Sequence, residues 1–310
     1  MAPNVIRPPR LRPGDTVRLV SPSGPPLPEK TEAGVSLLKS WGLQVQVSDH
    51  AFDRYGYLAG NDDIRAAEFN AALRDAEVRG LFCTRGGYGV TRMVDSVDFA
   101  AAARDPKPVV GYSDITALFN ALYVHSGITG VHGPVMTTVG TGQDPAVGEA
   151  LRTAVMTDEP VVLSPHPAEA TGALTRGETV VSGRLLGGNL SLVVDAVGTS
   201  SCPDYDGAIL FCEEVNEEPY RLDRILTQLR RAGTLDGIVG IALGQFTGCA
   251  DADWDWDVLD VLRDRLNDLG VPILGGLRFG HGTDPLTVPF GTMATLDPVT
   301  RILTAGAAVG

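Results

Sequence analysis

The sequence predicts an α/β protein with two domains, on three observations. The chain has 310 residues, which is more than one hydrophobic core usually organises. Short apolar runs alternate with helix-like segments before residue 165, a rhythm typical of a parallel sheet with helices on its faces. Residues 164–180 are polar and contain prolines and glycines, which indicates a linker. We therefore expect an N-terminal domain at 1–163, this linker, and a C-terminal domain at 181–310.

The N-terminal domain should contain four strands, with helices between them. In the first helix, Ala33, Leu37 and Trp41 recur at helical spacing, and Gly127 is suited to end the last. The expected elements are a strand in "DTVRLV" (15–20), a helix over 29–41, a strand in "LQVQVS" (43–48), a helix in "DIRAAEFNAALRD" (63–75), strands in "VRGLFCT" (78–84) and "PKPVVGYS" (106–113), and a helix in "DITALFNALYVHSG" (114–127).

The segment after the linker shows strands and helices in a different arrangement. Leu222, Ile225, Leu226 and Leu229 form one helical face, and Pro219 suits the first turn of that helix. The expected elements are strands in "GAILFCEE" (207–214) and "GIVGIALGQF" (237–246), the helix between them, a helix in "WDVLDVLRDRLNDLG" (256–270), and a small antiparallel ribbon in "TVPFGTMATLDPVTRILTAG" (287–306).

Composition and charge exclude several classes of function. The net charge is −13, from 25 basic and 38 acidic residues, so no basic field would attract a nucleic acid. No apolar stretch approaches the ~18 residues of a membrane span, and the N-terminus has no apolar core of a signal peptide. We therefore expect a cytoplasmic protein.

The cysteines do not indicate a metal site. They lack the CxxC spacing of zinc ligands, and most lie in or beside apolar runs, so we expect reduced thiols and no metal. They are Cys83, Cys202, Cys212 and Cys249.

The stretch "VVGYSDIT" (109–116) brings Ser113 to the junction of a strand and a helix. Two interpretations fit this position. Serine is a preferred N-cap residue. Alternatively, the partial positive charge and free N–H groups of a helix start would favour a serine nucleophile and the oxyanion that it creates. The hydrolase turn G-x-S-x-G is only half present, because Ile115 stands where the second glycine would be.

The loop in "CTRGGYGV" (83–90) follows a predicted strand directly. Its glycines, Gly86, Gly87 and Gly89, would let backbone N–H groups approach a ligand closely. The loop fails the dinucleotide pattern and lacks the lysine of a phosphate loop. It remains either a tight turn or a donor loop for an oxyanion, in which Arg85 could pair with a carboxylate.

Two further stretches supply a carboxylate and a base. The strand in "LFCEEVNEEPYRLDR" (210–224) ends in Glu213 and Glu214, which should point to opposite faces. A carboxylate there could orient a histidine, or the stretch could be an acidic solvated loop. In "RFGHGTDPLTVPFG" (278–291), His281 lies between two glycines and is a natural general base. His132 in "GVHGP" is its competitor.

Together these stretches identify a family. The combination of "TRGGYG", "GYSDITAL", "GRLLGGNL", "LFCEEVNEEPYRLDRILTQL" and "FGHGTDPLTVPFG", in this order, resembles the LD-carboxypeptidases, a serine peptidase family that includes the enzymes of microcin C self-immunity. The likeness spans nearly the whole chain.

The resemblance implies a fold and a set of site residues. The family has an N-terminal α/β domain with parallel strands, a C-terminal domain of mixed strands and helices, and an active site in the cleft between them. Its motifs imply Ser113 as nucleophile, Glu213 as carboxylate and His281 as base. They also imply oxyanion donors on the backbone of Asp114 and of Gly86 or Gly87. We assign Arg85 and Tyr88 to substrate binding, and expect a homodimer without metal or cofactor.

Three functions are then open. The first is removal of terminal D-alanine from murein tetrapeptides during cell-wall recycling. The second is microcin C-type immunity, in which an aminoacyl sulfamoyl or phosphoramidate nucleotide is cut. That activity usually goes with an aromatic residue in the linker region, and residues 160–180 contain none, which favours the first. The third is a protein that binds peptides without cutting them, although all three triad positions are filled.

Overall fold

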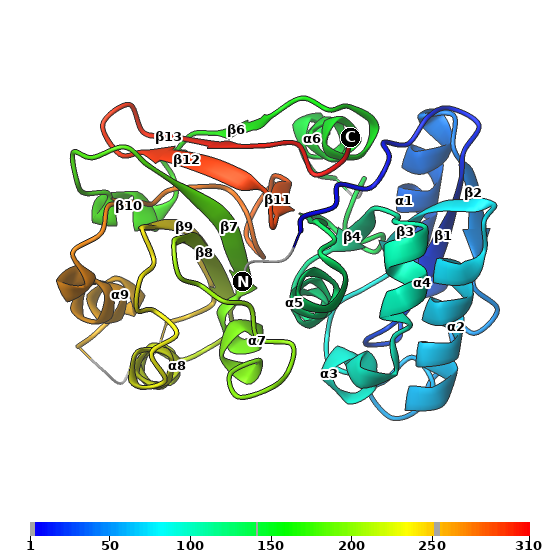
Figure 1. Ribbon diagram of the computed structural model, residues 1–310, viewed down its shortest axis with the longest axis horizontal. Coiled ribbons are helices and arrows are strands. Elements are labelled where there is room, and N and C mark those ends of the chain that lie inside the picture. Colours follow the sequence, from blue (N-terminus) through cyan, green and yellow to red (C-terminus); the bar gives the residue numbers. More distant parts are fainter. Residues whose placement is uncertain (1–3, 141, 251–254) are drawn as a thin grey trace. The chain divides into compact units, whose positions relative to one another are not determined.

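The computed structural model describes residues 4–140, 142–250 and 255–310. The chain forms two compact units of mixed α/β structure. Unit 1 comprises Met1–Glu159, Leu286–Gly291 and Ala307–Gly310, and unit 2 comprises Pro160–Pro285 and Thr292–Gly306. Figure 1 labels their elements.

The described residues of unit 1 build a six-stranded sheet in the order β11-β5-β4-β3-β1-β2. The first five strands along the chain pair in parallel, which confirms the expected parallel sheet, while the last pairs antiparallel with β5. The strands are β1 (Thr16–Val20), β2 (Gln44–Val47), β3 (Val78–Cys83), β4 (Val109–Gly111), β5 (Gly130–His132) and β11 (Val288–Phe290).

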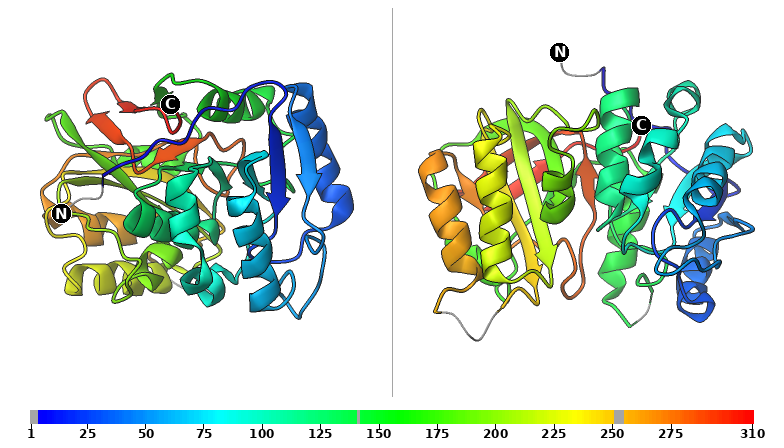
Figure 2. Two further views of the ribbon diagram at one scale, coloured as in Figure 1. Left: turned by 45° about the vertical axis from the view of Figure 1, so that its right-hand side comes forward. Right: turned by 90° about the horizontal axis from the view of Figure 1, so that it is seen from below.

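Helices border this sheet (Figure 2). Leu38 of α1 and Leu151 of α6 belong to one apolar cluster with Leu19, Phe82 and Val110 of the strands. Helix α4 contacts both α2 and α5. The helices are α1 (Pro28–Ser40), α2 (Asp62–Arg74), α3 (Val90–Met93), α4 (Phe99–Arg104), α5 (Ile115–Ser126) and α6 (Pro145–Met156), with a 3₁₀ turn η1 (Val94–Ser96).

Unit 2 contains, in its described part, a seven-stranded sheet in the order β10-β9-β8-β7-β12-β13-β6. Strands β7 to β10 pair in parallel, and the other pairs are antiparallel. The antiparallel β12–β13 pair confirms the expected ribbon for that part of the terminal segment. The strands are β6 (Val161–Leu163), β7 (Val181–Asn189), β8 (Ala208–Val215), β9 (Gly240–Thr247), β10 (Ile273–Leu274), β12 (Met293–Asp297) and β13 (Ile302–Ala305).

Three helices lie in a row beside the parallel strands of unit 2 (Figure 1). Pro219 occupies the first turn of the middle helix, as the sequence predicts, and Leu222, Leu226 and Leu229 are its buried face. The helices are α7 (Leu190–Asp195), α8 (Pro219–Arg231) and α9 (Val258–Leu266), with 3₁₀ turns η2 (Ala170–Leu174) and η3 (Asn267–Leu269). Among the described residues, none of the helices combines the length and the apolar character that a membrane span requires.

The division into units differs from the expected domains at the C-terminal end. The expected C-terminal domain included all of residues 181–310, but β11 belongs to unit 1. Its backbone pairs with β5, and the Phe290 ring stacks on Phe119 with their centroids 5.7 Å apart. The last residues also join unit 1, where Thr129 Oγ1 donates to the Ala308 carbonyl at 2.7 Å. Sheet pairing and aromatic packing, rather than position in the sequence, therefore decide to which unit β11 belongs.

The expected linker, residues 164–180, also belongs to unit 2. It contains η2, and Thr171 Oγ1 donates to the Gly244 carbonyl at 3.0 Å. The backbones of Arg176 and Ile273 exchange hydrogen bonds of 2.8 and 2.9 Å. The polar residues that suggested a linker instead form hydrogen bonds with β9 and with the edge strand β10.

Candidate active site

Ser113 lies in a strained turn between β4 and α5. Its φ is +65°, in the left-handed region that costs a residue with a side chain roughly 1–2 kcal/mol. The N-cap of α5 is Asp114, whose side chain makes no capping hydrogen bond. The interpretation of Ser113 as an N-cap is therefore wrong. The strained conformation is of the kind that clusters at active sites.

Gly86 of the glycine loop (residues 85–89) lies close to Ser113. A Cβ atom on Gly86 would lie 2.8 Å from the Cβ of Ser113 and 3.1 Å from its Oγ, so a side chain has no room there. Gly87 and Gly89 have φ values of +114° and +138°, which favour glycine. The loop therefore needs its glycines, and its backbone adjoins the serine.

The carboxylate of Asp114 ties two loops together beside Ser113. Its Oδ2 accepts hydrogen bonds from Ser23 Oγ at 2.6 Å and from the Val90 amide at 3.0 Å. Burial raises the pKa of Asp114 above its ordinary value. Arg65, also buried, donates to the Pro22 carbonyl and to the Gly89 carbonyl. The sequence analysis missed Arg65 and this second role of Asp114, because nothing local shows which loops meet.

Arg85 and Tyr88 are exposed beside Gly86 and Gly87. One guanidinium nitrogen of Arg85 donates to the Pro25 carbonyl at 3.1 Å. The ring of Tyr88 contacts that of Tyr57, with centroids 5.8 Å apart and ring planes at 57°. Tyr57 is thus a further aromatic residue of this surface that the sequence analysis did not single out.

In unit 2, Glu213 and His281 form a hydrogen-bonded pair. Nδ1 of His281 lies 2.6 Å from Oε2 of Glu213. The Glu213 side chain is fully buried, and that of His281 is 14% exposed. Gly280, with a φ of +114°, precedes the histidine, and a Cβ there would lie 2.6 Å from the same carboxylate oxygen. The hydrogen bond between Glu213 and His281 therefore requires a glycine at position 280, because any side chain there would collide with Glu213.

A β-bulge lies opposite Glu213. Cys212 of β8 pairs with Leu243 of β9, whereas Glu214 pairs with Phe246, so β9 has one extra residue there. Bulges often redirect side chains next to active sites. The bulge coincides with the point where the Glu213 carboxylate meets the imidazole.

Glu214 points elsewhere, as the alternation of a strand predicts. Its Oε1 accepts from Asn189 Nδ2 at 2.6 Å and from the Val215 amide at 2.9 Å, and its Oε2 accepts from the amide and hydroxyl of Ser191 at 2.8 and 2.7 Å. Burial raises the pKa of Glu214. This carboxylate therefore holds the start of α7, while Glu213 faces His281.

His132, the competing base, is buried in β5. Its ring meets that of Tyr112 edge-on, with centroids 6.2 Å apart.

Within the described residues, no group of three or more His, Cys, Asp or Glu side chains is arranged to hold a metal ion. The four cysteines are free, and burial raises the pKa of Cys249 to about 11.

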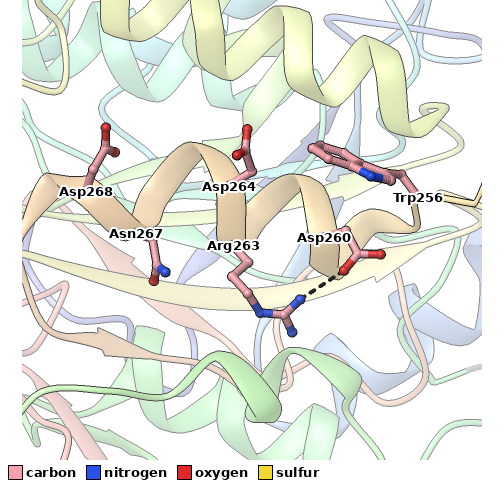
Figure 3. A pocket seen from close by; sticks show the side chains of 6 residues that line it. All are labelled: Trp256, Asp260, Arg263, Asp264, Asn267 and Asp268. Atoms are coloured by element: carbon pink, nitrogen blue, oxygen red, sulfur yellow. Dashed lines mark hydrogen bonds and ion pairs between the residues drawn. The ribbon is translucent and has the colours of Figure 1, made fainter.

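The structure thus presents two groups of predicted site residues. Unit 1 brings Ser113 together with the glycine loop and Asp114, and unit 2 brings Glu213 to His281. A surface pocket of about 530 Å³ along α9 contains none of them (Figure 3). Its lining is polar, and Arg263 is already paired with Asp260 at 2.9 Å. The lining residues are Trp256, Asp260, Arg263, Asp264, Asn267 and Asp268.

Proteins of similar sequence carry the names of carboxypeptidases. A Streptomyces coelicolor protein named "putative carboxypeptidase" is 41% identical over 306 residues, covering 97% of this chain and 96% of its own. The murein tetrapeptide carboxypeptidase of Pseudomonas aeruginosa is 30% identical and covers 91% and 92%, respectively.

Solved structures share the fold. The muramoyltetrapeptide carboxypeptidase of Oxalobacter formigenes superposes with a TM-score of 0.83 at 29% identity, covering 95% of this chain and all of that one. MccF in complex with glutamyl sulfamoyl guanosine superposes with a TM-score of 0.87 at 22% identity, covering 97% and 98%. The family models for the LD-carboxypeptidase N-terminal and C-terminal domains match residues 17–133 and 182–296. The chain therefore belongs to the LD-carboxypeptidase family.

Proposed function

We propose that this protein is a serine carboxypeptidase that removes terminal D-alanine from murein tetrapeptides, with Ser113, Glu213 and His281 as its catalytic triad. The observation that carries the proposal is the 2.6 Å hydrogen bond between Nδ1 of His281 and the buried Glu213. A carboxylate in this position fixes the imidazole tautomer with the proton on Nδ1, which leaves Nε2 as the basic nitrogen.

In the proposed reaction, Ser113 Oγ attacks the carbonyl carbon of the bond to D-alanine as Nε2 of His281 takes its proton. Glu213 stabilises the imidazolium that forms. The protonated Nε2 then gives its proton to the amine of D-alanine as the carbon–nitrogen bond breaks. Water, activated by the same nitrogen, hydrolyses the acyl-enzyme and regenerates Ser113.

Backbone groups next to Ser113 would stabilise the oxyanion. We assign this role to the N–H groups of Asp114 and of Gly86 or Gly87, supported by the close approach of Gly86 to the serine. Arg85, exposed in the same loop, would pair with the terminal carboxylate of the substrate, and Tyr88 would contact the peptide.

The names of two relatives support the proposed substrate class. These names specify murein or muramoyl tetrapeptides. The likeness to MccF at 22% identity supports the fold alone. The cytoplasmic location and the homodimer stay predictions from the sequence.

The test offers purified protein a murein tetrapeptide and an aminoacyl sulfamoyl adenylate side by side, with free D-alanine and free amino acid as the readouts. Release of D-alanine supports the proposal. Cleavage of the sulfamoyl adenylate alone would assign a microcin C-type activity instead. A protein that cuts neither and fails to react with a fluorophosphonate would be a binding protein.

A further inference from the structure

Gln245 lies directly beneath the loop that carries His281. It belongs to β9 at the bulge described above, and only 2% of it is exposed. Its carboxamide Nε2 donates to Glu169 Oε1 at 2.7 Å and to the Thr283 carbonyl at 3.0 Å. Its Oε1 accepts from the Gly282 amide at 3.0 Å. One buried amide therefore meets three partners, two of them next to His281 along the chain.

The partners fix the orientation of this amide. A carbonyl and a carboxylate only accept hydrogen bonds, and a backbone N–H only donates. The assignment of nitrogen and oxygen in Gln245 is therefore determined by its surroundings, and only a carboxamide satisfies all three partners. A carboxylate of the same shape would lose both donated bonds.

The backbone of Gln245 extends this contact along the whole His281 loop (residues 279–283). Its amide donates to the Phe279 carbonyl at 3.0 Å, so both ends of the loop bond to one residue. A Cβ on Gly282 would lie 2.5 Å from the carboxamide, which shows how closely the loop rests on it. Gln245 thus holds the backbone on both sides of His281, and Glu213 holds its imidazole ring.

The third partner, Glu169, belongs to the segment 164–180. Thr171 fastens that segment by donating to the Gly244 carbonyl at 3.0 Å and accepting from the Gly276 amide at 2.9 Å. The His166 amide donates to the Gly276 carbonyl at 2.8 Å. The Gln245 amide therefore connects an ordered segment, through Glu169, to the His281 loop.

We propose that Gln245 is a positioning residue that holds His281 in its productive orientation and couples the segment 164–180 to it through Glu169. The proposal rests on the proposed function because it takes His281 as the general base. Gln245 itself touches neither Ser113 nor the substrate in this proposal.

The test compares Gln245→Glu with Gln228→Glu, which makes the same change at an exposed position of α8. Gln245→Glu keeps the acceptor for Gly282 but places a carboxylate against Glu169 and the Thr283 carbonyl. We expect kcat to fall about 100-fold, as for a small misplacement of a catalytic group, with KM little changed because binding does not use His281. Gln228→Glu should match the wild type in both constants.

Rescue distinguishes positioning from general damage. In the double variant Gln245→Glu with Glu169→Gln, the new amide at 169 can donate to the new carboxylate at 245, and the repulsion between these two side chains is gone. The double variant should recover about 10-fold in kcat over Gln245→Glu alone, the effect of one hydrogen bond to a charged group. If Gln245→Glu fails to fold, Glu169→Ala serves alone, since Glu169 is only half-buried; it should lower kcat about 10-fold.

A second readout is independent of substrate. The imidazole proton on Nδ1 of His281, held by Glu213, gives an NMR signal that should broaden or shift in Gln245→Glu and stay unchanged in Gln228→Glu. An unchanged signal together with a kcat within twofold of the wild type would overturn the positioning role. If the wild type hydrolyses neither test substrate, the proposed function fails, while the NMR comparison still decides whether Gln245 positions His281.

Discussion

Oε2 of Glu213 lies 2.6 Å from Nδ1 of His281, although the two residues are 68 positions apart in the chain. The adjacent carboxylate, Glu214, makes its four hydrogen bonds to Asn189, Ser191 and Val215 instead. Two neighbouring glutamates, both buried, thus have separate surroundings, which makes their roles separable by substitution.

Glu213→Gln should lower kcat by about 10⁴-fold, the size of the corresponding effect in serine protease triads, because the amide no longer fixes the imidazole tautomer. Glu214→Gln should keep kcat within about 10-fold and instead lower the free energy of unfolding, because its NH₂ group would face donors and leave one of them unsatisfied. Steady-state kinetics and urea unfolding of both variants check this. A dead Glu214→Gln beside an active Glu213→Gln would require the triad to be redrawn.

Ser113→Ala should abolish hydrolysis, with a loss that can reach ~10⁶-fold in serine triads. Ser113→Gly should be equally inactive but more stable than Ser113→Ala by about 1 kcal/mol, because glycine adopts a φ of +65° without strain. Activity assays and urea unfolding of the two variants make the comparison. Residual activity above a tenth of the wild type would exclude Ser113 as the nucleophile, and equal stabilities would argue against strain.

Gly86→Ala should lower kcat/KM by at least about 100-fold, because the added Cβ would lie 2.8 Å from that of Ser113 and displace the serine or the loop. Gly172→Ala is the matched control. It too lacks a positive φ, and its Cβ would meet nothing closer than 3.6 Å. The prediction fails if both alanine variants turn over substrate at the wild-type rate.

The pH dependence of stability should report the buried carboxyl of Asp114. Because burial raises its pKa above the ordinary value of 3.8, the folded state binds more protons than the unfolded chain between the two pKa values. The contribution of Asp114 to the free energy of unfolding should therefore decrease as the pH rises through that window, and increase again as the pH falls.

Asp114→Asn removes this contribution. Its amide oxygen can still accept from Ser23 and Val90, and the NH₂ group would take the place of Oδ1, which has no hydrogen-bond partner among the described side chains and backbone. Urea unfolding from pH 4 to pH 8 should show a flatter dependence for the variant than for the wild type. Parallel curves for the two proteins would contradict the prediction.

Local sequence patterns determined most of the secondary structure and marked the stretches from which we propose the site residues. The strand and helix periods predicted β1, β2, β3 and α5 at nearly their observed bounds, because apolar spacing reports which face of an element is buried. The structure shows that Gly86 and Gly280 lie where the Ser113 side chain and the Glu213 carboxylate leave no room for a Cβ atom.

Tertiary structure decided what depends on pairing between distant segments. The assignment of β11 to the sheet of unit 1 arises from its pairing with β5, about 150 residues earlier. Likewise, the hydrogen bond between Glu213 and His281 joins residues 68 positions apart, and the place of Gln245 under the His281 loop depends on the bulge in β9. No local period encodes these relationships, because the direction of a side chain at a bulge is set by the register of two strands together.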